Sequence, residues 1–283
     1  MSEDPKKSSE AHDKDALSKV ALTTDPLHLI DEHEEEVRVD GKVERHKGIY
    51  LLPNLFTTGA LFSGFYAIIA AMNNDFEPAA IAIFVAMILD GLDGRVARLT
   101  NTQSKFGAEY DSLADMVSFG VAPALVMFSW GLSNLGKFAW ATTFIYVACA
   151  ALRLARFNTQ IDTADKNVFS GLASPAAAGV VAGVVWSGVD VGYGDAGLPS
   201  LMAVASGCLT AVMGFLMVSN IPYNSFKSFD LKGRVPFVAM IAVIMLFGLI
   251  SLDPARVLLL GFLIYAVSGP IASLLKRGEK TST

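Results

Sequence analysis

Eight long blocks of apolar residues follow a polar N-terminal segment in this chain. Each block has about 17–25 residues, which is enough for an α-helix to cross a hydrocarbon core of ~30 Å. The blocks lie near residues 52–72, 77–98, 106–130, 138–157, 171–188, 199–219, 234–251 and 255–275. The pattern predicts an all-α integral membrane protein, a polytopic bundle of about eight transmembrane helices.

Polar segments at both ends complete a three-part organisation. We expect residues 1–48 to form a disordered cytoplasmic tail, because they are rich in charged residues and poor in apolar blocks. Residues 49–275 are expected to form the transmembrane domain, and residues 276–283 a second cytoplasmic tail. The blocks show no internal repeat, which argues against an inverted-repeat transporter.

Basic residues gather in every second connection between the blocks. If the N-terminal tail is cytoplasmic, the basic residues of the inside connections are Arg95, Arg98, Lys105, Arg153, Arg156, Lys166, Lys227, Lys232, Arg234, Lys276, Arg277 and Lys280. The outside connections contain only Lys137 and Arg256 as cations, beside five acidic residues. A multi-pass protein of the inner (cytoplasmic) membrane is expected, and this positive-inside asymmetry predicts that both of its termini lie in the cytoplasm.

The overall composition agrees with a membrane protein and excludes one class of partner. The chain has 283 residues, of which 53% are hydrophobic and 17% are charged, against about 25% charged residues in soluble domains. Residues 1–48 hold 13 acidic and 8 basic residues, so the net charge of −5 lies in the tail. Nucleic acid is not expected as a partner, because its binding requires a basic surface.

Four aspartates stand inside or at the end of the second and third blocks. They follow the pattern Asp90-x-x-Asp93-Gly94-x-x-Ala97-Arg98, then eight residues, then Gly107-x-x-x-Asp111-x-x-x-Asp115. A carboxylate in a membrane span is costly, so a functional role is the default interpretation. Helical spacing puts each pair on one face. The short connection at 99–105 predicts that the two helices are antiparallel neighbours whose four carboxylates face one another.

Facing carboxylates repel one another unless cations hold them together. Oxygen ligands without nearby His or Cys favour Mg²⁺, Mn²⁺ or Ca²⁺ over zinc. Two such ions suit displacement at phosphorus. Gly91, Gly94 and Ala97 remove side-chain bulk beside the carboxylates, and Arg98 offers a two-pronged contact to a phosphate.

These residues resemble the signature of the CDP-alcohol phosphatidyltransferases. The eight matching positions are Asp90, Asp93, Gly94, Ala97, Arg98, Gly107, Asp111 and Asp115. Other segments are similar to the membrane-integral bacterial members that use serine as acceptor: 53–57 (Pro-Asn-Leu-Phe-Thr), 151–158 (Ala-Leu-Arg-Leu-Ala-Arg-Phe-Asn), 171–178 (Gly-Leu-Ala-Ser-Pro-Ala-Ala-Ala) and 219–223 (Ser-Asn-Ile-Pro-Tyr). One departure is Ala173, where the family pattern has proline.

The resemblance implies a six-helix catalytic core with two additional helices, assembled as a homodimer in the membrane lipid. The implied enzyme transfers the phosphatidyl group from CDP-diacylglycerol to the hydroxyl of L-serine and releases CMP. By motif position, Asp90, Asp93 and Asp111 bind two divalent cations, Mg²⁺ or Mn²⁺. Asp115 is the general base and also lies close to the metals.

Other residues are assigned by the same resemblance to the two substrates. Gly94, Ala97 and Arg98 belong to the part of the signature that holds the CDP moiety, and Asn54 is a further contact to it. Arg153 and Arg156 are expected to hold the serine carboxylate or a lipid phosphate, and the choice stays open. The remaining candidates for this pocket are Asn158, Ser174 and Lys227.

Two other functions remain open at this point. The first keeps the fold and the chemistry but uses glycerol 3-phosphate, an inositol phosphate or choline as acceptor. A phosphorylated acceptor requires more cations than Arg153, Arg156, Lys166 and the 227–234 cluster provide. The second is a divalent-cation transporter, which predicts carboxylates near the bilayer midplane. Here they lie toward the cytoplasmic ends of two helices, beside Arg98.

Overall fold

The structure, a computed structural model, describes residues 34–39, 42–47, 51–100, 104–160, 168–194, 197–224 and 237–281. Its α-helices are α2 (Leu51–Met72), α3 (Phe76–Leu99), α4 (Lys105–Asp115), α5 (Ala122–Met127), α6 (Lys137–Gln160), α7 (Ser174–Asp190), α8 (Ser200–Val218), α9 (Phe237–Leu252) and α10 (Pro254–Thr281). The π-helical segment η1 (Met116–Val121) joins α4 to α5, and a second π-helical segment, η2 (Phe128–Leu132), and a 3₁₀ turn, η3 (Ser133–Leu135), follow α5. We call this continuous stretch, from α4 to η3, the rod.

Each of the eight predicted apolar blocks corresponds to a helix or to this rod, and most ends agree within a few residues. Among the described residues, five segments are long and apolar enough to cross a membrane: Asn54–Met72, Phe106–Leu135, Lys137–Thr159, Ser200–Val218 and Pro254–Leu275. Of the other three, α3 carries the charged motif, and α7 and α9 have 17 and 16 residues. The expected fold class, an all-α membrane protein, is confirmed.

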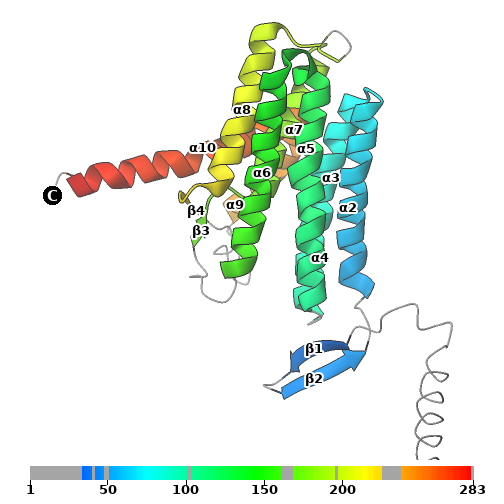
Figure 1. Cartoon of the computed structure of the whole chain (residues 1–283). Coiled ribbons are helices and arrows are strands. Elements are labelled where there is room, and N and C mark those ends of the chain that lie inside the picture. The colour runs from blue at the N-terminus through cyan, green and yellow to red at the C-terminus, as the bar shows by residue number, and fades with distance from the viewer. Residues whose placement is uncertain are drawn as a thin grey trace, which may run out of the picture.

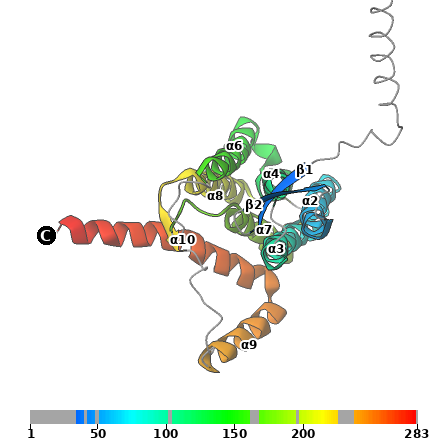
Figure 2. The ribbon, with the colours of Figure 1, turned by 90° about the horizontal axis from the view of Figure 1, so that it is seen from below.

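The helices α2, α3, the rod, α6, α7 and α8 lie side by side in a bundle (Figures 1 and 2). Small residues fill much of its interior, among them Ala79, Ala80, Ala177 and Ala178, which are fully buried. Such residues let helix backbones approach closely in lipid, where packing rather than the hydrophobic effect drives association. Large apolar side chains such as Phe62 point outward, as expected for a lipid-facing surface.

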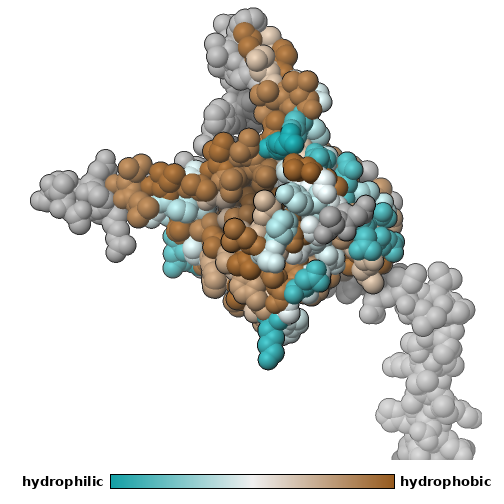
Figure 3. Space-filling view, turned by 90° about the horizontal axis from the view of Figure 1, so that it is seen from above, coloured by the Kyte–Doolittle hydropathy of each residue, from teal (hydrophilic) through white to brown (hydrophobic). Residues whose placement is uncertain are grey.

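The last two helices extend from the side of the bundle, and α10 lies at a steep angle to the others (Figures 1 and 2). The first half of α10 packs on α7 at two glycines. A Cβ atom at Gly179 would lie 2.7 Å from the ring of Phe262, and one at Gly183 would lie 3.0 Å from Leu259. Apolar side chains cover much of both projecting arms (Figure 3), including Phe247 and Ile264.

Two short antiparallel pairs of strands were not predicted by the sequence pattern. β1 (Glu34–Val39) pairs with β2 (Lys42–Lys47) within the segment 1–48, for which we expected disorder; residues 1–33 lie outside the described residues. β3 (Val168–Ser170) pairs with β4 (Pro222–Asn224) and so ties the segment before α7 to the segment after α8. This second pair lies at the end of the bundle where α6 and α8 end and α7 begins.

A glycine makes the β3–β4 connection possible. Gly171 has a φ of 88°, and its N–H donates to the carbonyl of Ile221 at 2.9 Å. The next N–H, that of Leu172, donates to the carbonyl of Leu216 at 2.9 Å. A Cβ atom at Gly171 would lie 2.3 Å from the carbonyl oxygen of Met217, so only glycine fits.

Candidate active site

Three of the four aspartates converge where α3 ends and α4 begins. One carboxylate oxygen each from Asp90, Asp93 and Asp111 lies within 4.8 Å of the other two. Oxygens that share one hard cation at about 2.0–2.6 Å are separated by at most ~5 Å. The three carboxylates therefore fit a shared divalent cation without large movement. Helix α2 packs against both α3 and α4 and so holds the two halves of the motif at one place.

Asp115 lies beside this cluster rather than within it. The carboxyl group of Asp90 lies near those of both Asp111 and Asp115. Asp115 is also close enough to the guanidinium of Arg153 for their charges to interact. Asp115 is therefore a neighbour of both the three-carboxylate cluster and a cation from α6. The π-helical segment η1 begins at the next residue, and such irregular turns are frequent at functional sites.

A threonine that sequence reasoning missed orients one of the aspartates. The hydroxyl of Thr57, on α2, donates to Oδ2 of Asp93 at 2.7 Å, and both side chains are buried. Thr57 belongs to the 53–57 segment that resembles the family, but no role was predicted for it. Its position three residues after Asn54 places both on one face of α2, which is the signal that links it to the site.

The residues predicted to contact the CDP moiety lie next to the carboxylates. A Cβ atom at Gly91 or Gly94 would meet no other atom within 4 Å, so these two glycines face open space. Helix–helix contact therefore does not explain them. Arg98 folds back along its own helix, where Nε donates to the carbonyl of Gly94 at 2.7 Å. Ala97, which precedes Arg98 in the sequence, is half-buried.

Asn54 reaches the same region from α2. Its Oδ1 lies 3.5 Å from the position that a Cβ atom at Gly107 would take. The Tyr110 and Thr58 hydroxyls bond at 2.8 Å, and Thr58 also donates to the backbone carbonyl of Asn54 at 2.7 Å. Asn54 is thus fixed at the contact between α2 and α4, one turn from Thr57.

The residues predicted to bind the acceptor substrate do not all lie in one pocket. Arg153 donates from Nη1 to Oγ of the buried Ser174 at 2.6 Å, so these two form one unit beside Asp115. Arg156 instead donates to the carbonyl of Val218 at the end of α8, at 3.4 Å. Asn158 accepts from Ser112 of α4 at 3.2 Å. Lys227 lies outside the described residues.

A buried tyrosine fixes the rod just after Asp115. Pro123 has no N–H to offer the carbonyl of Phe119, four residues earlier. The hydroxyl of Tyr146, on α6, donates to that carbonyl at 3.0 Å, and its side chain is fully buried. The irregular backbone that follows Asp115 is therefore held by a side chain from a neighbouring helix.

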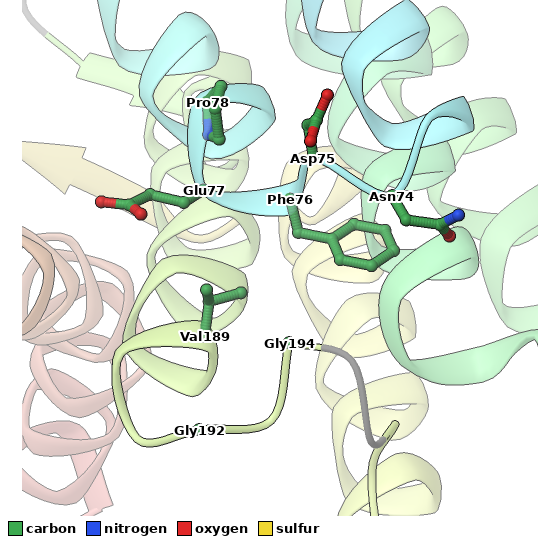
Figure 4. Close-up of a pocket in the computed structure, with 8 residues that line it drawn as sticks. All are labelled: Asn74, Asp75, Phe76, Glu77, Pro78, Val189, Gly192 and Gly194. Atoms are coloured by element: carbon green, nitrogen blue, oxygen red, sulfur yellow. The ribbon is translucent and has the colours of Figure 1, made fainter.

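A surface hollow at the opposite end of α3 is separate from this site. Figure 4 shows it between the α2–α3 turn and the loop after α7, with Asp75 and Glu77 among its lining residues. Asp90 follows Glu77 along α3 by about 20 Å, at a rise of ~1.5 Å per residue. The hollow therefore has no part in the chemistry of the carboxylates.

Known proteins resemble this chain over the segment that contains the site. The sequence model of the family described as CDP-alcohol phosphatidyltransferase matches residues 50–189. A Helicobacter pylori protein named CDP-diacylglycerol–serine O-phosphatidyltransferase is 38% identical over 223 residues, which cover 79% of this chain and 91% of the relative. Proteins of the same name from Mycobacterium tuberculosis and Saccharomyces cerevisiae are 39% and 38% identical, and their matches cover 54% and 59% of this chain and 56% of each relative.

Proposed function

The chain belongs to the CDP-alcohol phosphatidyltransferase family, and from that premise we propose that it is a phosphatidylserine synthase of the membrane. It transfers the phosphatidyl group of CDP-diacylglycerol to the hydroxyl of L-serine and releases CMP. The observation that carries the proposal is the convergence of Asp90, Asp93 and Asp111 within 4.8 Å. The names of relatives that match most of the chain support serine as the acceptor.

The carboxylates divide into two roles in this proposal. Asp90, Asp93 and Asp111 hold two divalent cations, Mg²⁺ or Mn²⁺, and Asp115 contributes to the same site. When bound, the cations neutralise the carboxylates and stabilise negative charge on the pyrophosphate. The open space at Gly91 and Gly94 supports an approach of the CDP moiety along α3. Asn54, Ala97 and Arg98 complete that side of the site.

The reaction is a displacement at the phosphorus that carries diacylglycerol. Asp115 accepts the proton of the serine hydroxyl as the hydroxyl oxygen forms its bond to phosphorus. The bond from phosphorus to the CMP oxygen breaks, and CMP leaves with the electron pair. Arg98 adds positive charge near the leaving phosphate. The position of Asp115 near both the carboxylate cluster and Arg153 supports its role as the base.

Arg153 and Ser174 form the acceptor side of the site in this proposal. A guanidinium binds a carboxylate through two parallel hydrogen bonds, which suits the carboxylate of serine. Their mutual hydrogen bond of 2.6 Å supports a shared role. Arg156 and Asn158 support this pocket from its border, where they bond to α8 and α4.

The setting of the enzyme is also proposed. The protein lies in the inner (cytoplasmic) membrane with both termini and the active site on the cytoplasmic side. The positive-inside distribution of basic residues supports this orientation. CDP-diacylglycerol then keeps its acyl chains in the bilayer while its polar group reaches the carboxylates. Two copies assemble as a homodimer, as the family resemblance implies.

The test is acceptor selectivity. Purified protein in detergent receives CDP-diacylglycerol with Mg²⁺ or Mn²⁺, and CMP release is measured separately with serine, glycerol 3-phosphate, an inositol phosphate and choline. We expect release with serine alone, and its loss when EDTA removes the cations. Release with another alcohol would overturn the assignment of the acceptor and leave the roles of the aspartates in place. EDTA-resistant release would overturn the metal assignment.

A further inference from the structure

Helix α10 lies outside the bundle formed by α2, α3, the rod, α6, α7 and α8, yet it packs on α7, whose first residue bonds Arg153. Tyr265, on α10, is half-buried. The contacts of α10 with α7 pass from Gly183 to Gly179, so the next turn of α10, which carries Tyr265, lies toward the start of α7, where Ser174 bonds Arg153. Arg153 thus has Ser174 of α7 as its hydrogen-bond partner and has Asp115 of the rod and Tyr265 of α10 nearby. None of the assignments above gives Tyr265 a role.

A second tyrosine fastens α10 at this point. Pro270 interrupts the hydrogen bonding of α10, because it has no N–H for the carbonyl of Ala266, four residues earlier. The hydroxyl of Tyr223, on β4, donates to that carbonyl at 2.9 Å. Ala266 and Tyr223 are both buried, so this hydroxyl supplies, away from water, the donor that Pro270 lacks.

The ring of Tyr223 fits against α10 as closely as its hydroxyl does. A Cβ atom at Gly269 would lie 2.4 Å from the ring, so glycine provides the space that the ring occupies. The ring also contacts that of Tyr265, with centroids 5.6 Å apart. Burial and the nearby Tyr265 raise the pKa of Tyr223 to about 12, so its hydroxyl keeps the proton that it donates at neutral pH.

We propose that α10 completes the acceptor side of the active site: Tyr265 contacts the acceptor next to Arg153, and Tyr223 is the positioning residue that holds Tyr265 there. The inference rests on the proposed function, since it concerns the same acceptor pocket. A phenol beside a guanidinium suits an acceptor that has both a carboxylate and a hydrogen-bonding polar group, as an amino acid with a free hydroxyl does. The additional C-terminal helices are then part of substrate selection.

The experiment compares three variants by steady-state kinetics of CMP release. Tyr265→Phe is expected to raise KM for serine about tenfold, the equivalent of one hydrogen bond to a charged or polar group. Its KM for CDP-diacylglycerol is expected to stay within about twofold. Tyr223→Phe keeps the ring but removes the donor to the carbonyl of Ala266. It is expected to raise KM for serine several-fold, because α10 then holds Tyr265 less firmly. In Tyr223→Phe/Pro270→Ala, the new N–H at position 270 serves the carbonyl of Ala266 and restores KM.

The matched control is Tyr66→Phe, which removes the same hydroxyl from an exposed ring on α2. Equal KM values for serine in Tyr265→Phe and Tyr66→Phe would overturn the pocket role of Tyr265. A double variant no better than Tyr223→Phe would overturn the positioning role of Tyr223. If the wild type uses another alcohol, the proposed acceptor is wrong, and the same comparison made with that alcohol still decides the role of α10.

Discussion

At the scale of single residues, the hydrogen bond from Thr57 to Asp93 is expected to affect metal affinity. A ligand carboxylate has to present a defined oxygen to its cation, and its hydrogen-bonding partners fix that orientation. Thr57→Val keeps the shape of the side chain and removes the donor at 2.7 Å. We expect metal affinity to fall by roughly 10–100-fold. Titration of the purified protein with Mn²⁺, followed by electron paramagnetic resonance, measures the change.

The matched control for this substitution is Thr210→Val on α8. Thr210 is also buried, but its hydroxyl donates to the carbonyl of Ser206 within its own helix at 2.8 Å. Its variant is expected to bind Mn²⁺ as the wild type does. Equal losses in both variants would mean that any buried threonine hydroxyl matters for folding and that Thr57 has no special role.

Replacing Asp111 or Asp115 of the rod by asparagine is expected to affect metal binding and turnover differently. Asp111→Asn removes one of the three converging carboxylates proposed to bind metal. We expect weaker metal binding and turnover lowered by roughly 100-fold or more, because even an outer-shell partner is worth about 10–100-fold. Asp115→Asn removes the proposed base and is expected to lower turnover by about 10²–10⁴-fold while Mn²⁺ affinity changes less. Metal titration and CMP release on the same preparations separate the two effects. An Asp111→Asn variant with full metal-dependent turnover would refute the metal assignment.

The sequence predicted these aspartates because their spacing carries information within two short segments. Asp90 and Asp93 share a helix face, and Asp111 and Asp115 are one turn apart, so local geometry already brings each pair together. Thr57, Tyr223 and Tyr265 were missed for the opposite reason. Their partners lie 36 residues or more away along the chain, and no local pattern predicts which helix faces meet.

Gly64 lies at a tight contact between helices, whereas Gly94 faces open space in the proposed CDP site. A Cβ atom at Gly64 of α2 would lie 2.5–3.0 Å from Ser118 of the rod, whereas one at Gly94 would meet nothing within 4 Å. We expect Gly64→Ala to cost about 1–3 kcal/mol of stability, because backbone and side chain have to move apart. Gly94→Ala is expected to keep the melting temperature and to raise KM for CDP-diacylglycerol.

Thermal unfolding in detergent and steady-state kinetics, applied to both glycine variants, give the two readouts. A lower melting temperature for Gly94→Ala with unchanged KM would show that this glycine serves packing. The helix interior gains a little propensity from Ala in both cases, so propensity alone does not produce the contrast.

At the scale of elements, the length of the apolar blocks predicted the helices, but the irregular backbone segments were not predicted. The eight predicted blocks match helices because about 20 apolar residues have few alternatives in a bilayer. The π-helical segments after Asp115 and the β3–β4 pair were not predicted. The first of these segments accepts, at the carbonyl of Phe119, a hydrogen bond from Tyr146 on another helix, and the β3–β4 pair depends on a positive φ at Gly171 that a neighbouring backbone enforces.

The whole molecule places all of its assigned chemistry at one end of the bundle. The carboxylate cluster, the Arg153–Ser174 pair and the β3–β4 connection lie where α3, α6 and α8 end. A polar substrate such as serine has to reach this end from water, so the orientation of the bundle decides which compartment supplies it. The proposed orientation gives the cytoplasm that role, because the inside connections hold most of the basic residues.

Cysteine accessibility tests this orientation directly. Cys149 and Cys208 are first replaced by alanine, because they are the only native thiols. Single cysteines are then introduced at Asn73, in the α2–α3 turn, and at Thr100, at the end of α3, which are both exposed. In right-side-out vesicles, an impermeant maleimide is expected to label position 73 at once and position 100 only after permeabilisation. The reverse order would put the carboxylates on the outer side and exclude a cytoplasmic supply of serine.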